Sequence, residues 1–175
     1  RTAAYTPERG AQYPEGAFGS RLLQAARLIK ARVGLEAVAI DLEGWDSHFT
    51  QKTLIEPLMR QLAAGLGAFA QDLGARLATV SVVVMTEFGR RVQENSSFGT
   101  DHGRGSVMFV LGGGVKGGQL AGRWPGLERD ILEGPGDVPV ANNYRDVLAP
   151  VLVRHGAEAY LGIIFPNFKR APLNI

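Results

Sequence analysis

The stretch TVSVVVMT, residues 79–86, is the strongest strand signal in the chain and decides the predicted fold. Most of its residues are apolar or β-branched at consecutive positions, and Gly74 and Gly89 bound the run. A continuous apolar run of this length is typical of a strand buried on both faces of a parallel sheet. We therefore expect this segment to lie at the centre of a sheet.

The elements before this strand extend the prediction to an α/β fold. Residues 51–74 carry one apolar stripe at helical spacing, made by Leu54, Leu58, Leu62, Leu66, Phe69 and Leu73. Residues 35–42 are predicted as another strand that ends at Gly44. Strand, helix and strand with connections of this length form a βαβ unit with a right-handed crossover. The predicted architecture is a mostly parallel sheet with flanking helices.

The rest of the chain completes this architecture. A third strand is predicted over residues 106–111, and helices over residues 20–33 and 144–155, with Ser20 and Asn143 as their N-caps. Residues 1–19 are predicted as an extended lead-in, and residues 112–141 as irregular structure with one short hairpin. With no internal repeat and no clear boundary, residues 1–175 are predicted to form a single domain.

Composition excludes several classes of protein. The net charge is only +2 and the Lys and Arg residues are scattered, so nucleic acid is not an expected partner. Without cysteine there is no disulfide framework and no thiolate metal site. The apolar run of residues 80–85 is far shorter than the roughly 20 residues of a membrane span. Residues 1–5 do not have the form of a signal peptide, and the missing initiator Met suggests a fragment or a processed product.

Polar residues gather where the predicted strands end. Asp46 and His48 follow the first strand, Glu87 follows the second, and Asp101 and His102 directly precede the third. Ligands of open parallel sheets bind beyond the carboxyl ends of the strands. Carboxylate and imidazole groups suit a divalent ion such as Zn²⁺ or Mn²⁺, so these five residues are the predicted metal ligands. The alternative, that each Asp and His caps a turn or bonds to a backbone carbonyl, stays equally open.

Glu87 is also a candidate general base, because it closes a strand and precedes Arg90 and Arg91. Either arginine can bind an anionic group through its guanidinium fork. An ion pair between Glu87 and an arginine that only holds the loop accounts for the same residues equally well. The GGGVKG stretch at residues 112–117 fits a nucleotide-binding pattern formally, but Gly122 and Pro125 interrupt the helix that such a site requires, so no nucleotide cofactor is predicted.

Five motifs carry a family resemblance. They are GWDSH at 44–48, TEFGRR at 86–91, GTDHG at 99–103, LGGGVKGG at 111–118 and NYRDV at 143–147. In this order, over most of residues 12–175, they resemble bacterial proteins of the domain of unknown function 1501 family. The resemblance implies the C-terminal part of an alkaline-phosphatase-like domain in the alkaline phosphatase and sulfatase superfamily. It also implies a twin-arginine export signal and hence an exported or periplasmic protein.

The resemblance assigns roles to individual residues. Asp46 and His48 are similar to the superfamily's first metal-binding pair, and His102 to its last metal-binding histidine. Phe88 follows Glu87 where the superfamily has histidine, and Asp101 can supply the missing ligand. Asn143 stands where aspartate is expected and receives no ligand role. The nucleophile and a further metal-binding aspartate are implied to lie in an upstream N-terminal segment of the same protein.

The implied activity is metal-dependent hydrolysis of a phosphate or sulfate ester of a small molecule or glycan. The metal ions would activate the nucleophile while Arg90 or Arg91 offsets charge on the nonbridging oxygens. The alternative is a catalytically degenerate exported domain that binds a ligand or a protein. A metal that copurifies with the protein and is lost with His48 and His102 would favour the enzyme.

Overall fold

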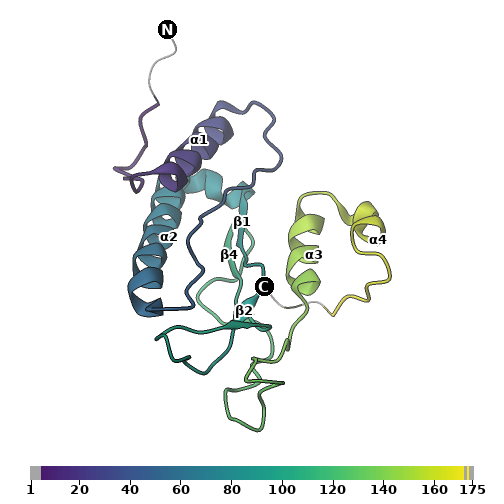
Figure 1. Cartoon of the computed structure of the whole chain (residues 1–175). Coiled ribbons are helices and arrows are strands. Elements are labelled where there is room, and N and C mark those ends of the chain that lie inside the picture. The colour runs from purple at the N-terminus through teal and green to yellow at the C-terminus, as the bar shows by residue number, and fades with distance from the viewer. Residues whose placement is uncertain (1–4, 172, 174–175) are drawn as a thin grey trace. The chain divides into compact units, whose positions relative to one another are not determined.

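The described residues fall into two compact units. The computed structural model describes residues 5–171 and 173 (Figure 1), so the first four residues of the predicted lead-in lie outside the described residues. The first unit comprises Arg1–Val80 and Asn95–Gly99, and the second comprises Ser81–Glu94 and Thr100–Ile175. The prediction of a single domain stays a prediction.

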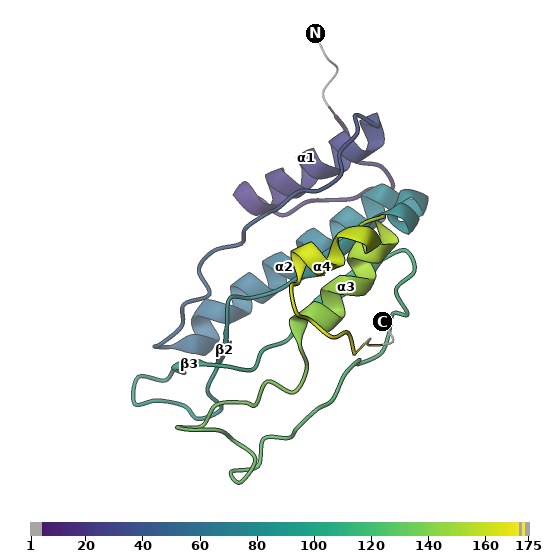
Figure 2. The ribbon, with the colours of Figure 1, turned by 90° about the vertical axis from the view of Figure 1, so that its right-hand side faces the viewer.

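Two long helices form the core of the first unit. Helix α1 (Ala17–Ala31) lies beside α2 (Gln51–Leu73), as Figure 1 and Figure 2 both show, and the short 3-10 helix η1 (Gly74–Thr79) follows. Phe18 and Leu22 of α1 press on Gly65 of α2, where an added Cβ would come within 2.5 Å of the Phe18 ring. The remaining buried apolar residues of the pair include Ala25, Ala26, Leu62, Ala68, Phe69 and Leu73. The two helices therefore bury one apolar stripe each against the other.

The helix predicted over residues 51–74 is confirmed almost to the residue. The helix predicted over residues 20–33 is confirmed as an element but begins earlier, because the N-cap is Gly16 rather than Ser20. Gly16 has φ 93°, a left-handed conformation that glycine adopts without steric cost. Ser20 instead lies inside the helix and donates its backbone N–H to the Gly16 carbonyl at 3.1 Å.

The strand predicted over residues 35–42 is wrong. This segment is described throughout and forms no strand, and Val38 is 56% exposed. Side chains rather than a neighbouring strand bond to its carbonyls: the Trp45 indole donates to Leu42 O at 2.7 Å and Arg21 to Asp41 O at 3.4 Å. Without a partner strand, the backbone of these residues cannot form the hydrogen bonds of a sheet.

The strands of the second unit also correct the predicted fold. Strand β1 (Ser81–Val84) pairs antiparallel with β4 (Phe109–Gly112), and β2 (Gly89–Arg90) pairs antiparallel with β3 (His102–Gly103). Among the described residues there are thus two small antiparallel sheets, and the mostly parallel sheet with a βαβ crossover was wrong. The run at 79–86 located β1, but an apolar run does not specify strand direction.

The last part of the second unit is helical. Helix α3 (Tyr144–Arg154) is followed by the 3-10 helix η2 (Glu158–Tyr160) and the short α4 (Leu161–Ile164). The predicted cap is confirmed, because Asn143 Oδ1 accepts the Arg145 backbone N–H at 3.0 Å. Residues 112–141 are largely irregular, and an isolated bridge between Glu133 and Asp137 marks the short hairpin. None of the described helices has the length and apolar character that a membrane crossing requires.

Candidate functional site

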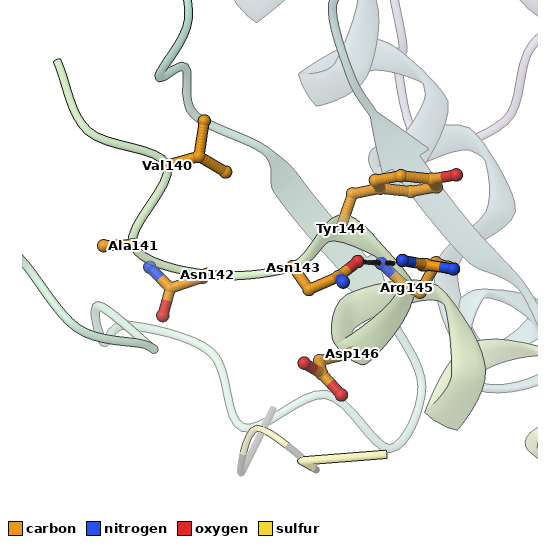
Figure 3. Close-up of a pocket in the computed structure, with 7 residues that line it drawn as sticks. All are labelled: Val140, Ala141, Asn142, Asn143, Tyr144, Arg145 and Asp146. Carbon is orange, nitrogen blue, oxygen red and sulfur yellow. Dashed lines mark hydrogen bonds between the residues drawn. The ribbon is translucent and has the colours of Figure 1, made fainter. Parts of the chain in front are cut away.

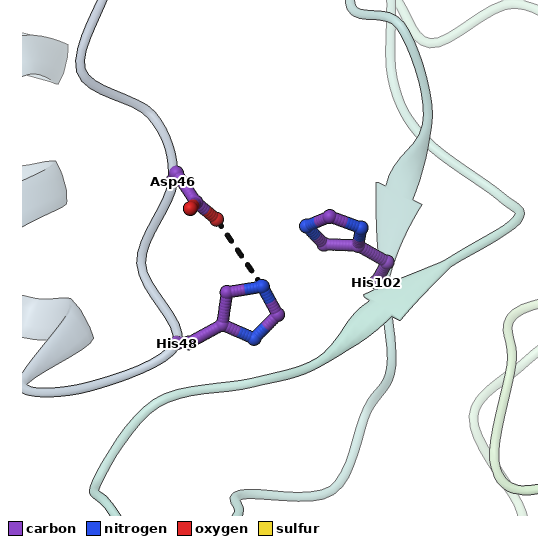
Figure 4. Close-up of side chains that lie close together, drawn as sticks. All are labelled: Asp46, His48 and His102. Carbon is purple, nitrogen blue, oxygen red and sulfur yellow. Dashed lines mark ion pairs between the residues drawn. The ribbon is translucent and has the colours of Figure 1, made fainter.

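Asp46 and His48 form a pair in the loop that leads into α2. His48 Nε2 lies 3.3 Å from Asp46 Oδ1, and 40% of the His48 side chain and 75% of the Asp46 side chain are exposed (Figure 4). Ser47 between them is fully buried, and its Oγ accepts a hydrogen bond from Gln51 Nε2 at 3.2 Å. The buried Ser47 anchors the loop, while the side chains of its two neighbours are exposed. An exposed contact between a carboxylate and an imidazole adds little stability, so the main property of the pair is the exposure of its two side chains.

Asn95 fixes the backbone of His48, and sequence reasoning missed it. Its Nδ2 donates to His48 O at 2.9 Å, while its Oδ1 accepts the backbone N–H groups of Ser97 at 2.9 Å and Gly99 at 3.1 Å. Gly99 packs closely against the His48 carbonyl group, because a Cβ added at Gly99 would be 2.2 Å from His48 C. The Asn-Ser-Ser-Phe-Gly run was a usable signal, since asparagine commonly bonds to the backbone of its own turn.

His102 lies on β3 of the second unit, and Figure 4 also labels it. Its ring centroid is 4.2 Å from that of Phe88, with the ring planes tilted by 40°. Phe88 therefore supports the imidazole of a predicted ligand. The ring of His102 is restricted by this contact while the residue stays exposed.

The two arginines have different surroundings. Arg90 donates from Nη1 to Thr100 O at 2.5 Å. Arg91 lies between two carboxylates, with Nη1 3.5 Å from Asp101 Oδ2 and Nε 3.4 Å from Asp137 Oδ1. Within the described residues, Arg91 Nε and Asp137 Oδ1 are buried without hydrogen-bond partners. The ion pair between them is therefore what offsets the cost of burying these two atoms. Arg91 is therefore mainly a structural cation, while Arg90 stays a predicted ligand of an anionic group.

Glu87 lies exposed just beyond β1 and forms no ion pair with another described residue. The alternative prediction, an ion pair between Glu87 and an arginine that holds this loop, is therefore not seen among the described residues. Instead, Thr86 Oγ1 donates to Phe88 O at 2.9 Å and lies 2.8 Å from Ser106 Oγ. The carboxylate of Glu87 remains accessible for chemistry.

Another cluster that the sequence did not reveal surrounds Asp72 in the first unit. Asp72 is fully buried, and its Oδ2 accepts the Tyr5 and Tyr13 hydroxyls at 2.8 Å each. Its Oδ1 accepts the Glu8 backbone N–H at 2.8 Å and Lys30 Nζ at 2.5 Å. These contacts tie residues 5–13 to the two helices.

The titration properties of this cluster follow from its donors. Burial alone would raise the pKa of Asp72, but hydrogen bonds led by the one from Lys30 hold that pKa below its ordinary value. Burial, together with the hydrogen bond to Asp72, raises the pKa of Tyr13 far above its ordinary value. Burial would lower the pKa of Lys30, yet its bonds to Asp72, Tyr5 and Glu8 raise it. Asp72 and Lys30 are therefore charged at neutral pH, and both tyrosines are neutral.

A surface hollow lined by residues 140–146 lies at the N-terminus of α3 in the second unit (Figure 3). Its polar side chains already have partners. Asn142 bonds to the Arg123 N–H at 2.7 Å and to the Arg123 carbonyl at 2.8 Å, and the buried Asp146 accepts the Ala171 N–H at 2.6 Å. The hollow is held by its own bonds and has no marked ligand site.

Comparison with known proteins gives a family. The family model described as "Protein of unknown function (DUF1501)" matches residues 2–162. The chain therefore belongs to the DUF1501 family, which confirms the family resemblance of its five motifs. No curated protein and no solved structure matches the chain.

Proposed function

We propose that this chain supplies ligands to the metal site of a hydrolase that cleaves phosphate or sulfate esters. In this proposal the chain is the C-terminal part of an alkaline-phosphatase-like domain, exported through the twin-arginine route and completed by an upstream segment. The observation that carries the proposal is the Asp46–His48 pair, whose side chains are exposed and whose atoms Oδ1 and Nε2 lie 3.3 Å apart. A carboxylate oxygen and an imidazole nitrogen are both ordinary ligands of Zn²⁺ and Mn²⁺.

The backbone around the pair supports such a role. The buried Ser47 is held by the hydrogen bond from Gln51, and the hydrogen bond from Asn95 to His48 O holds the main chain at His48. Metal sites depend on outer groups of this kind, because they limit the positions that the ligand side chains can take. The loop is thus more restricted than its exposure alone would suggest.

His102 remains a third ligand proposed from the resemblance of its motif, Gly-Thr-Asp-His-Gly at residues 99–103. Asp101 and Glu87 remain ligands proposed from the sequence, with Glu87 also available as a general base.

A bound metal would supply a Lewis acid that polarises the ester and activates the attacking nucleophile. This chain's own contribution would be to hold that ion, and to place the Arg90 guanidinium near the nonbridging oxygens. Arg91, which lies between Asp101 and Asp137, would position the loop rather than bind substrate.

Metal analysis of the protein in its full natural length tests the proposal. We expect stoichiometric Zn²⁺ or Mn²⁺ in the purified protein, and hydrolysis of phenyl phosphate or phenyl sulfate that a chelator abolishes. His48→Ala with His102→Ala should remove both metal and activity. His155→Ala is the matched control: the third histidine lies 2.9 Å from Ser81 Oγ in the second unit and should leave the metal in place.

Phe88, where the superfamily has histidine, favours a second candidate: a catalytically degenerate exported domain that binds a ligand or protein. Absence of metal from the full-length wild-type protein, with no hydrolysis of either ester after Zn²⁺ or Mn²⁺ is added, would reject the enzyme and support this candidate. In that case the double variant should lose stability only.

A further inference from the structure

Two exposed phenylalanines flank the backbone that carries His48. Phe49 follows His48 directly, and Phe98 is its partner in an isolated antiparallel bridge of the first unit. The Thr50 N–H bonds to Ser97 O at 3.0 Å, and the Gln51 N–H to Phe98 O at 2.9 Å. Bridge partners have Cα atoms about 5 Å apart, so the two side chains begin side by side. Phe49 is 60% exposed and Phe98 is 69% exposed.

The backbone that presents these rings is strained. Phe98 has φ 60° and Thr50 has φ 41°, left-handed values that residues other than glycine adopt at a steric cost. Three hydrogen bonds of the Asn95 side chain, two within the turn and one to His48 O, hold the loop in this conformation. A large apolar ring held in solvent by strained backbone is unlike an incidental surface residue, because neither burial nor backbone preference accounts for it.

We infer that Phe49 and Phe98 form a platform that binds the flat apolar ring face of the ester whose phosphate or sulfate group lies at Asp46 and His48. The inference rests on the proposed function and adds a substrate class to it: esters of ring alcohols, either aryl or sugar. Phe49 adjoins His48 in the chain, and Phe98 adjoins Gly99, which contacts the His48 carbonyl. The platform is thus continuous with the proposed ligand pair.

The size of the platform favours one ring over a protein. Two phenylalanines at these exposures present roughly 250 Å² of apolar surface. A stable protein interface buries about 800 Å² on each partner, whereas one ring stacks on an aromatic face of this size. A second copy of the chain or another protein therefore needs far more surface than the pair offers.

Relative hydrolysis of ring and non-ring esters tests the inference in the full-length protein. The probes are phenyl phosphate, a hexose 6-phosphate and methyl phosphate. We expect Phe49→Ala and Phe98→Asn each to reduce kcat/KM for the preferred ring ester by roughly five- to tenfold, with little change for methyl phosphate. Asparagine tolerates the left-handed backbone, so this variant removes the ring while preserving the turn. Which ring ester responds distinguishes an aryl from a sugar substrate.

The controls are aromatic residues of matched exposure elsewhere. Tyr160 is 60% exposed and Trp124 is 68% exposed, and alanine at either should leave the ratio of ring to methyl ester unchanged. An unchanged ratio in both platform variants overturns the inference while hydrolysis itself persists. A change of oligomeric state in Phe98→Asn would also overturn it, by assigning the rings to an interface.

A binding measurement separates this failure from failure of the proposed function. Saturation-transfer NMR with phenol and with a methyl glucoside reports ring binding without any catalysis. If no ester is hydrolysed, but saturation transfer to one of these probes is lost in Phe49→Ala and Phe98→Asn, the platform stands and the proposed hydrolase falls. If neither probe binds the wild-type protein, the platform falls.

Discussion

Replacing Asp72 with asparagine should destabilise the first unit by about 3 kcal/mol. Lys30 and Asp72 have side chains that are 8% and 0% exposed, so asparagine leaves the ammonium group in a buried place without its carboxylate. Breaking a buried pair on one side costs about 3–5 kcal/mol. The lower end applies here, because the Glu8 carboxylate remains 3.1 Å from Lys30 Nζ and is half exposed.

The geometry of asparagine supports the same estimate. Its single carbonyl oxygen can replace Oδ1, which accepts from Lys30 and from the Glu8 N–H. Its NH₂ group then faces the hydroxyls of Tyr5 and Tyr13, which can rotate to accept. Hydrogen bonds are thus largely retained, and the loss comes from the charge. Against a typical total stability of about 5–15 kcal/mol, a loss of this size is large.

Urea unfolding followed by Trp45 fluorescence, with Trp124→Phe as the background, measures the change in the first unit. Glu56→Gln is the matched control, since Glu56 forms an exposed pair with Arg60 on the same helix and should cost less than about 0.5 kcal/mol. Lys30→Met combined with Asp72→Asn should recover part of the loss, because the unpaired charge is gone. A loss below about 1 kcal/mol for Asp72→Asn alone would refute the reasoning.

Three further predictions follow from the same structure. The free energy of unfolding should be retained up to about pH 10 and fall above it, because the unfolded chain releases tyrosine protons near the ordinary pKa of 10.0 while Tyr5 and Tyr13 keep theirs when folded. Urea unfolding from pH 8 to 11 measures this change, and a Tyr13→Phe protein whose stability falls equally steeply with pH would contradict it. Asn95→Ala should cost about 2 kcal/mol by removing three hydrogen bonds, with Asn95→Asp intermediate because it keeps the two that Oδ1 accepts; an Asn95→Asp protein as stable as the wild type would argue against the bond to His48. Phe98→Gly should raise stability by about 0.5 kcal/mol or more by relieving φ 60°, measured as a higher melting temperature; a lower melting temperature would mean that the ring is buried in solution.

Local signals in the sequence predicted the helices well. The stripe from Leu54 to Leu73 located α2, and Asn143 marked the start of α3, because both features depend only on neighbours in the chain. Strand pairing depends on distant partners, and this is where prediction failed. The run at 79–86 gave β1 its place, yet its antiparallel partner Phe109–Gly112 is determined by how the intervening chain folds back.

The candidate site was predictable only in part. The residue types of Asp46 and His48 and their spacing of two predicted a pair, and the structure places them 3.3 Å apart. The sequence did not indicate that Arg91 lies between Asp101 and Asp137, or that Asn95 bonds to His48 O across 47 positions. The Asp72 cluster was equally hidden, since its donors lie up to 67 positions away.

The loop Asn95–Gly99 also bears on how this protein can be divided. Although flanked on both sides by residues of the second unit, it belongs to the first unit and bonds to Thr50, Gln51 and His48. A gene segment encoding residues 1–80 alone would lack the loop Asn95–Gly99. Recombination therefore cannot transfer the first unit as one contiguous segment. Substitutions around His48 and substitutions in this loop should therefore occur together in related sequences.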